Sequence, residues 1–319
     1  MKTITKKAQK FTSILIFVSL FAFVSCNTQP VKRPLIFKDY PNLKIGFSTQ
    51  NFQIAMPNNV ENLTEIIEYA SKEGYQFIEL RDDLAILTSV ECVLLAEVAK
   101  RNNIDVIYEI HKNPLDSGYF DVFRRGLANA LLFPGPGILR TVISKSEFDS
   151  DVSKKGWNKD ELFRLAKISD SCALIAKEKN VKFIVENFNE AFFGDGQNYF
   201  GLADFFNNTS LSGLQLDMSN PFRKPSREMA DPEKVVQYLS TLGNRWVTTH
   251  LKTILIMGGD MQPVLTDNPL SVEKVIALMG HQNVLYAALE LAAVNDKQQC
   301  FNNHAKSIQF LRDKGILKN

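Results

Sequence analysis

The chain has 319 residues, with 37 Lys and Arg against 35 Asp and Glu, and its formal net charge is +2. Four of the lysines fall within residues 1–25, which contain no acidic residue, so the remainder has 33 basic against 35 acidic residues, a net charge of −2. No basic run remains there, which argues against nucleic acid as a partner. The remaining length suits one large barrel domain of roughly 250 residues or more.

The first 25 residues predict a signal peptide that takes no part in the fold. Four lysines precede an apolar run, residues 11–24, that is too short for a comfortable membrane span. The ending Phe23-Val24-Ser25-Cys26 resembles a bacterial lipoprotein signal, in which the cysteine becomes the lipidated first residue of the mature chain. The alternative is an ordinary secretory signal in which Cys26 is incidental.

The expected organisation is a signal at residues 1–25, a lipidated Cys26 with a tether to residue 40, and a barrel over residues 41–319. The protein would then be a lipoprotein of the bacterial cell envelope, periplasmic or on the outer membrane, held to the membrane by its lipid anchor alone. The other cysteines, Cys92, Cys172 and Cys300, are odd in number and widely spaced, so buried thiols are expected rather than disulfides.

Strand-like and helix-like patterns alternate from residue 43 to the end of the chain. Short apolar runs predict eight strands, at residues 43–49, 75–81, 104–110, 138–144, 181–187, 213–217, 246–252 and 283–290. Amphipathic stretches predict helices at residues 60–72, 90–101, 120–132, 160–178, 202–207, 232–242, 272–279 and 301–314, with Asn58 or Asn59, Ser89 and Gly74 as helix caps. Eight such units without a composition break predict an α/β fold, a single (β/α)8 TIM barrel.

Four of the predicted strands end on side chains that can bind a metal ion. They end on Glu186, Asp217, His250 and Glu290. The carboxyl ends of the strands form the rim at which such barrels build their active sites, so these side chains are expected to converge. Carboxylates with one imidazole suit one divalent ion, with Mn²⁺ the first choice and Mg²⁺, Co²⁺, Fe²⁺ or Zn²⁺ as alternatives. Any one of them alone would be interpreted as a salt-bridged rim residue.

Glu186 and Glu290 are also the predicted catalytic acid and base. Carboxylates on the fifth and eighth strands would approach the pocket from opposite sides, which suits removal of a proton from one face of a carbon and its return to the other. Lys252 and His111 are further catalytic candidates, because Lys252 points to the same side of its strand as His250, whereas His111 follows the third strand and is equally compatible with a loop residue without a role.

The remaining polar residues near the rim are candidates for binding substrate. The candidates for binding substrate are Arg81, Asn187, Asn220, Arg223 and Trp157. Other polar positions at the rim are Glu109, Lys112 and Arg140. Trp157 could stack on a sugar, although a tryptophan that anchors its own loop is the more common outcome. His281 and His304 fall on helical segments and are not expected to function.

Several motifs together resemble the xylose isomerase-like TIM barrel superfamily, the sugar phosphate isomerase/epimerase group. They are Glu186-Asn187, Leu216-Asp217 through Asn220, His250-Leu251-Lys252 and Leu289-Glu290, with Ile78-Glu79-Leu80-Arg81 as weaker support. The resemblance covers the predicted barrel. It implies that the four strand-end residues are metal ligands and that the two glutamates also act as acid and base.

The chain departs from the pattern of the ketohexose 3-epimerases. Asn220 stands where those enzymes have a histidine, Ile256 where they have an arginine, and Phe192 where they have a second glutamate. Thr253 replaces the aspartate that many relatives carry after the His-x-Lys motif. The contacts to the sugar hydroxyls are therefore rebuilt, and free fructose or tagatose is not implied as substrate.

The sequence thus predicts a divalent-metal-dependent sugar isomerase or epimerase that removes a proton next to a carbonyl and passes through an enediolate. One alternative is a lyase or hydrolase of 3-keto-glycosides that uses the same site, and another is a sugar-binding lipoprotein without turnover. The expected partners are a small sugar or keto-sugar and the membrane, through the lipid anchor only, while a homodimer is left open.

The lipid anchor can be tested by replacing Cys26 with Ser. Because the cysteine sulfur is the atom that carries the lipid, Cys26→Ser should leave an uncleaved precursor or release soluble protein, with the barrel still folded. Membrane fractionation and mass spectrometry of the N-terminal peptide measure this. Unchanged acylation and fractionation in the variant would refute the anchor.

Overall fold

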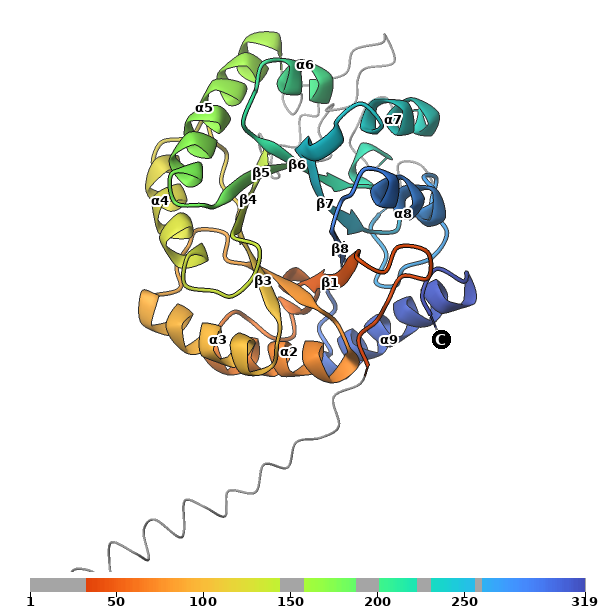
Figure 1. Ribbon diagram of the computed structural model, residues 1–319. Coiled ribbons are helices and arrows are strands. Elements are labelled where there is room, and N and C mark those ends of the chain that lie inside the picture. Colours follow the sequence, from red (N-terminus) through yellow and green to blue (C-terminus); the bar gives the residue numbers. More distant parts are fainter. Residues whose placement is uncertain (1–32, 144–157, 188–200, 223–230, 256–259, 319) are drawn as a thin grey trace, which may run out of the picture. The chain divides into compact units, whose positions relative to one another are not determined.

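The computed structural model describes residues 33–143, 158–187, 201–222, 231–255 and 260–318 of the chain. Within these ranges, parallel strands β1 to β8 form a closed barrel in sequence order, and the helices form an outer ring (Figure 1). The predicted (β/α)8 barrel is therefore confirmed. No helix among the described residues is long and apolar enough to span a membrane. The predicted signal, Cys26 and residues 27–32 of the tether lie outside these ranges and remain predictions.

The elements follow the predicted alternation. The strands are β1 (Lys44–Ser48), β2 (Phe77–Arg81), β3 (Asp105–Ile110), β4 (Ile138–Ile143), β5 (Lys182–Asn187), β6 (Gly213–Asp217), β7 (Trp246–Leu251) and β8 (Tyr286–Leu289). The helices are α2 (Val60–Glu73), α3 (Ser89–Arg101), α4 (Tyr119–Ala130), α5 (Lys159–Lys177), α6 (Gly201–Asn207), α7 (Pro232–Leu239), α8 (Val272–His281) and α9 (Lys297–Asp313), with short 3-10 turns η1 (Thr49–Phe52), η3 (Asn220–Phe222) and η4 (Gly243–Arg245).

Some helix ends differ from the prediction for local reasons. Thr88, not Ser89, caps α3, because its hydroxyl accepts from Glu91 N while the Glu91 carboxylate binds Thr88 N in return. Helix α9 begins four residues earlier than expected, since Asp296 caps Gln299 N ahead of a polar first turn that carries no apolar signal. Asn59 and Gly74 cap α2 as predicted.

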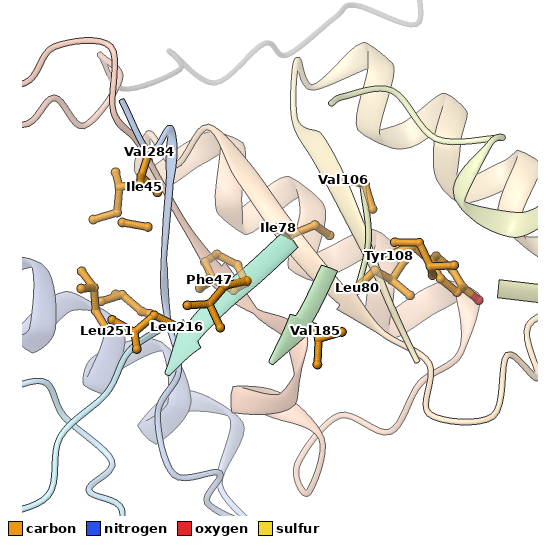
Figure 2. Packing of buried hydrophobic residues seen from close by; sticks show 14 of the residues in the cluster. Ile45, Phe47, Ile78, Leu80, Val106, Tyr108, Val185, Leu216, Leu251 and Val284 are labelled. Atoms are coloured by element: carbon orange, nitrogen blue, oxygen red, sulfur yellow. The ribbon is translucent and has the colours of Figure 1, made fainter. Parts of the chain in front are cut away.

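Side chains alternate between the two faces of the barrel wall, as the pleat of a strand requires. One set packs outward against the helices in a large apolar cluster, of which Figure 2 shows Phe47, Ile78, Leu80 and Val185. A second, smaller cluster is formed by Phe77, Ile107, Ile138, Ile184, Tyr286 and Ala288. These residues alternate with the outward set and lie mostly early in their strands, so they form an apolar floor inside the barrel.

The three described cysteines are free and buried, as predicted. Burial raises the pKa of the Cys92 and Cys172 thiols to about 12 in each case, so both are protonated near neutral pH. They therefore contribute to packing rather than to reactivity.

Candidate metal centre

A layer of polar side chains lies directly above the apolar floor. Glu79, Glu109, Arg140 and Glu186 each stand two residues after a floor residue on the same strand, so they point into the barrel one layer nearer the rim. Gln215 and His250 join them from β6 and β7, because Gln215 donates to Glu79 over 2.5 Å and His250 contacts the same carboxylate. All these side chains are buried. Such burial of charged groups is costly unless they are paired, so their partners define the layer.

The four predicted ligands come together. Glu186, Asp217, His250 and Glu290 each offer one ligand atom, and all four atoms lie within 4.8 Å of one another. The Nδ1 atom of His250 is 2.9 Å from Glu290 Oε2, 3.3 Å from Glu186 Oε1 and 3.8 Å from Asp217 Oδ2. This arrangement surrounds a common point with three carboxylate oxygens and one imidazole nitrogen.

His250 and Asp217 are each held by other groups on the side that faces away from the centre. The Nε2 atom of His250 is 2.5 Å from Glu79 Oε2, which places the Nε2 proton toward Glu79 and directs Nδ1 into the centre. Asp217 Oδ1 accepts from the backbone N–H groups of Ser219 and Asn220, each over 2.8 Å, which leaves Oδ2 to face the centre. Among the described residues, neither His250 Nδ1 nor Glu290 Oε2 takes part in a hydrogen bond of regular geometry, although the two atoms lie 2.9 Å apart and Lys252 Nζ is 2.6 Å from Glu290 Oε2. Two buried polar atoms directed at one point fit a bound cation.

Arg140 joins the ligands to the layer below. Its Nε and Nη2 atoms bind the two oxygens of Glu109 at 3.1 and 2.5 Å, and its Nη1 atom is 2.7 Å from Glu186 Oε2. Glu79, Glu109 and His250 could by themselves hold a second ion. However, the Arg140 guanidinium already pairs with Glu109, and Glu79 and His250 are already in direct contact. The arrangement therefore favours one metal ion, with Arg140 as the fixed cation beneath it.

The ionisation of the centre follows from these contacts. Burial opposes ionisation of Glu186, but Arg140 and His250 outweigh it and lower its pKa to about 2. Burial likewise opposes ionisation of Glu290, but Lys252 and His250 hold its pKa well below the usual range. Burial raises the pKa of Glu109 to about 8, because Arg140 only partly offsets it. Both ligand glutamates are thus carboxylates near neutral pH.

The charges also fit a divalent cation. Burial alone would lower the pKa of His250, but Glu79, Glu290 and Glu186 raise it well above its ordinary value, so the free centre carries an imidazolium. A divalent cation would take the place of the Nδ1 proton of His250.

Asn187 and Asn220 support the ligands. The side chain of Asn187 accepts from Asp217 N over 2.7 Å and donates to Asp217 O over 3.0 Å, so both its polar atoms bind the backbone of β6. Asn220 Nδ2 donates to Asn187 O over 3.0 Å and lies 3.4 Å from Glu186 Oε1. Asn187 was predicted to bind substrate, whereas these contacts make it a residue that positions Asp217.

Arg81 and His111 form a pair at the carboxyl ends of β2 and β3. Arg81 Nη2 is 2.7 Å from His111 Nδ1, and Arg81 also binds Asp83 and Gln50. Since a guanidinium can only donate, His111 must accept at Nδ1 and carries its proton on Nε2. In this tautomer His111 can donate to a substrate oxygen, but its Nδ1 cannot serve as a base.

The other candidates lie elsewhere. Trp157 and Arg223 fall outside the described residues. His304 lies in α9, packed among aromatic rings, where it contacts Asn51 and Tyr75, and burial lowers its pKa to about 3. It takes no part in the centre.

Solved structures share this architecture. A sugar phosphate isomerase/epimerase from Parabacteroides distasonis matches with a TM-score of 0.64 and 13% identity, over 86% of this chain and 98% of that chain. A D-psicose 3-epimerase from Clostridium cellulolyticum, in a structure with D-tagatose, matches with a TM-score of 0.62 and 13% identity, over 85% and 99% of the two chains. A xylose isomerase-like TIM barrel protein from Mycobacterium smegmatis, in complex with magnesium, matches with a TM-score of 0.58 and 13% identity, over 85% and 97%.

The chain has the fold of the xylose isomerase-like barrels. No family model and no curated protein matches the sequence. The predicted resemblance is therefore confirmed for the fold, while the chemistry is argued from the residues of the centre.

Glu79 provides a test of the support beneath His250. We expect Glu79→Gln to weaken divalent-metal binding by about 10- to 100-fold, because the neutral amide no longer fixes the imidazole with a charged hydrogen bond. Calorimetric titration with Mn²⁺ measures this, with Glu97→Gln, the same change on the exposed face of α3, as the control. Equal affinities in wild type and Glu79→Gln would show that Glu79 does not orient the ligand.

The raised pKa of His250 predicts how metal binding depends on pH. The ion must displace the Nδ1 proton, which the free protein retains above the ordinary pKa of 6.5. Affinity should therefore rise about tenfold per pH unit until the raised pKa is reached, with roughly one proton released per ion. Calorimetry in two buffers of different ionisation enthalpy counts that proton. Binding without proton release near pH 7 would contradict the imidazolium.

Proposed function

We propose that the protein is a divalent-metal-dependent sugar isomerase or epimerase, which removes and returns a proton on a carbon next to a carbonyl. The observation that carries the proposal is the placement of two ionised, buried carboxylates, Glu186 and Glu290, beside His250 Nδ1 at 3.3 and 2.9 Å. They come from β5 and β8, which lie apart in the barrel wall. A substrate carbon held between them has a carboxylate on each face.

Glu186, Asp217, His250 and Glu290 would hold the cation. When bound, a divalent ion supplies Lewis acidity that draws electron density from the substrate carbonyl and makes the neighbouring C–H more acidic. Mn²⁺ is the first candidate, since three carboxylates and one imidazole suit it, with Mg²⁺, Co²⁺, Fe²⁺ and Zn²⁺ as alternatives.

The side chains of the chain perform the proton transfer. For epimerisation, one glutamate would take the proton from one face of the carbon as a carboxylate, and the other, which must first acquire a proton, would deliver it to the opposite face. If the first glutamate returns the proton to the neighbouring carbon, the outcome is isomerisation. Burial of both carboxylates limits the access of bulk water to the reacting carbon.

The structural neighbours support this class of reaction. One D-psicose 3-epimerase structure contains D-tagatose, and another D-psicose 3-epimerase structure was determined in the presence of D-fructose. The substrate of the present chain is proposed to be a small sugar or keto-sugar. The lipid anchor at Cys26 is kept as part of the proposal, and a homodimer is left open.

A lyase acting on 3-keto-glycosides is the second candidate, and the position of Lys252 favours it. Elimination needs an acid that protonates the departing oxygen, and the Lys252 ammonium, 2.6 Å from Glu290 Oε2 in the metal-free centre, would face the substrate once an ion takes its place. Glu290 would take the proton next to the ketone and Lys252 would give one to the leaving group. The two candidates share the first step and differ in the product.

A screen of free sugars and 3-keto-glycosides with Mg²⁺, followed by NMR in D₂O, tests the proposal. Exchange of a C–H proton for deuterium reveals proton abstraction even without net product, and a released aglycone identifies elimination. Binding of sugars without any exchange across the screen, with metal bound, would favour the non-catalytic alternative.

The two glutamates should be distinguishable from a residue that only ligates. Glu186→Gln and Glu290→Gln are expected to lose on the order of 10² or more in turnover at saturating metal, because an amide cannot accept the proton. Asp217→Asn should recover part of its activity as metal is raised. Near-normal turnover of either Gln variant at saturating metal would rule out the mechanism with two carboxylates.

A further inference from the structure

The ammonium of Lys252 lies among the ligand oxygens. Lys252 follows β7 directly, is buried, and its Nζ is 2.6 Å from Asp217 Oδ2 and 2.6 Å from Glu290 Oε2. It also contacts Asn220 Oδ1 at 3.3 Å. Its backbone carbonyl accepts from Ser219 Oγ over 2.5 Å, so the strand end is fixed while four side-chain bonds remain rotatable.

The oxygens that Lys252 contacts are the ones a metal ion needs. Asp217 Oδ1 is occupied by two backbone N–H groups, so Oδ2 is the oxygen left to ligate. Glu290 Oε2 is the oxygen that faces His250 Nδ1 at 2.9 Å. The contact between Lys252 and Glu290 lacks hydrogen-bond alignment, since Glu290 Oε2 has no hydrogen-bond partner among the described residues. It is an ion pair that a stronger cation can replace.

Arg140 provides the contrast. It binds Glu186 through Oε2, whereas Oε1 is the oxygen that faces His250 at 3.3 Å. Arg140 and a metal ion would thus use different oxygens of one carboxylate. Lys252 and the ion would share the same oxygens, and a monovalent and a divalent cation at such short separation repel strongly in a site without bulk water.

We propose that Lys252 is the resident counterion of the metal-free centre and that binding of a divalent cation displaces it. In the free protein its ammonium holds Asp217 and Glu290 together in place of the ion. When the ion binds, the flexible lysine stem swings away from both oxygens, while Arg140 stays on Glu186. This inference rests on the proposed metal centre and concerns how that centre is filled.

Calorimetric titration of the full-length protein with Mg²⁺ and Mn²⁺ tests the exchange. We expect Lys252→Met to bind metal more tightly by on the order of tenfold or more, because the competing cation is gone. The matched control is Lys44→Met, which removes a lysine ion-paired to Asp105 at 2.5 Å at the start of β1 and should leave the affinity unchanged. Equal or weaker binding by Lys252→Met, with metal bound to wild type, overturns the inference. Absence of binding by both proteins overturns the proposed metal centre instead.

Crystal structures of the wild-type protein with and without Mn²⁺ decide the matter if Lys252→Met does not fold. With Mn²⁺ bound, Lys252 Nζ should lie beyond hydrogen-bonding distance, about 3.5 Å, of both Asp217 Oδ2 and Glu290 Oε2. Arg140 Nη1 should remain on Glu186. A lysine that keeps both contacts beside a bound ion shows that the two cations share the oxygens, which overturns the exchange.

Discussion

Negative charge inside the barrel is the constraint on which the rest of the centre depends. Carboxylates that lie away from bulk water repel one another and are stable only when each contacts a cation or a hydrogen-bond donor. Arg140 pairs with Glu109 and Glu186, His250 pairs with Glu79, and Lys252 pairs with Asp217 and Glu290. The positions of these charged side chains therefore depend on one another. A metal ion would bind at a point that carboxylate oxygens already surround.

The two glutamate ligands differ in the permanence of their partners. A guanidinium stays charged at any ordinary pH and is fixed here by three contacts to two carboxylates. An ammonium on a flexible stem is a single charge that can move. Glu186 is consequently a rigid element of the centre, whereas the surroundings of Glu290 can change between states, which makes the β8 side of the centre its adjustable side.

The sequence predicts the fold because each strand and helix carries its own local pattern. The four ligands could be found for the same reason, since they stand at strand ends, where a charged residue after an apolar run is visible. The layer of polar side chains above the apolar floor was harder to predict from the sequence. Glu109 and Arg140 were placed at the rim, and Glu79 was noted only within a motif. Their register two residues after Phe77, Ile107 and Ile138 places them in one inward layer with Glu186, deeper than the rim. That register is present in the sequence as a charged residue within an apolar strand.

Other features could not be predicted, because they depend on pairings between distant segments. The role of Asn187 follows from the β6 backbone that it contacts, and the tautomer of His111 follows from Arg81 on the neighbouring strand. A related reason explains why the chain shares its fold with a solved structure at only 13% identity. A barrel requires a pattern of apolar positions, whereas a substrate is selected by individual contacts at the rim, so neighbours with one architecture can act on different sugars.

The apolar floor determines from which side ligands can reach the centre. Phe77, Ile107, Ile138, Ile184 and Tyr286 fill the barrel below the polar layer, so ions and polar molecules approach the centre from the carboxyl ends of the strands. Under the proposed function, metal and substrate would share one entrance, and the metal would bind at the deeper position. A bound sugar would act as a plug above the ion, so the kinetics would be ordered, with the metal first to arrive and last to leave.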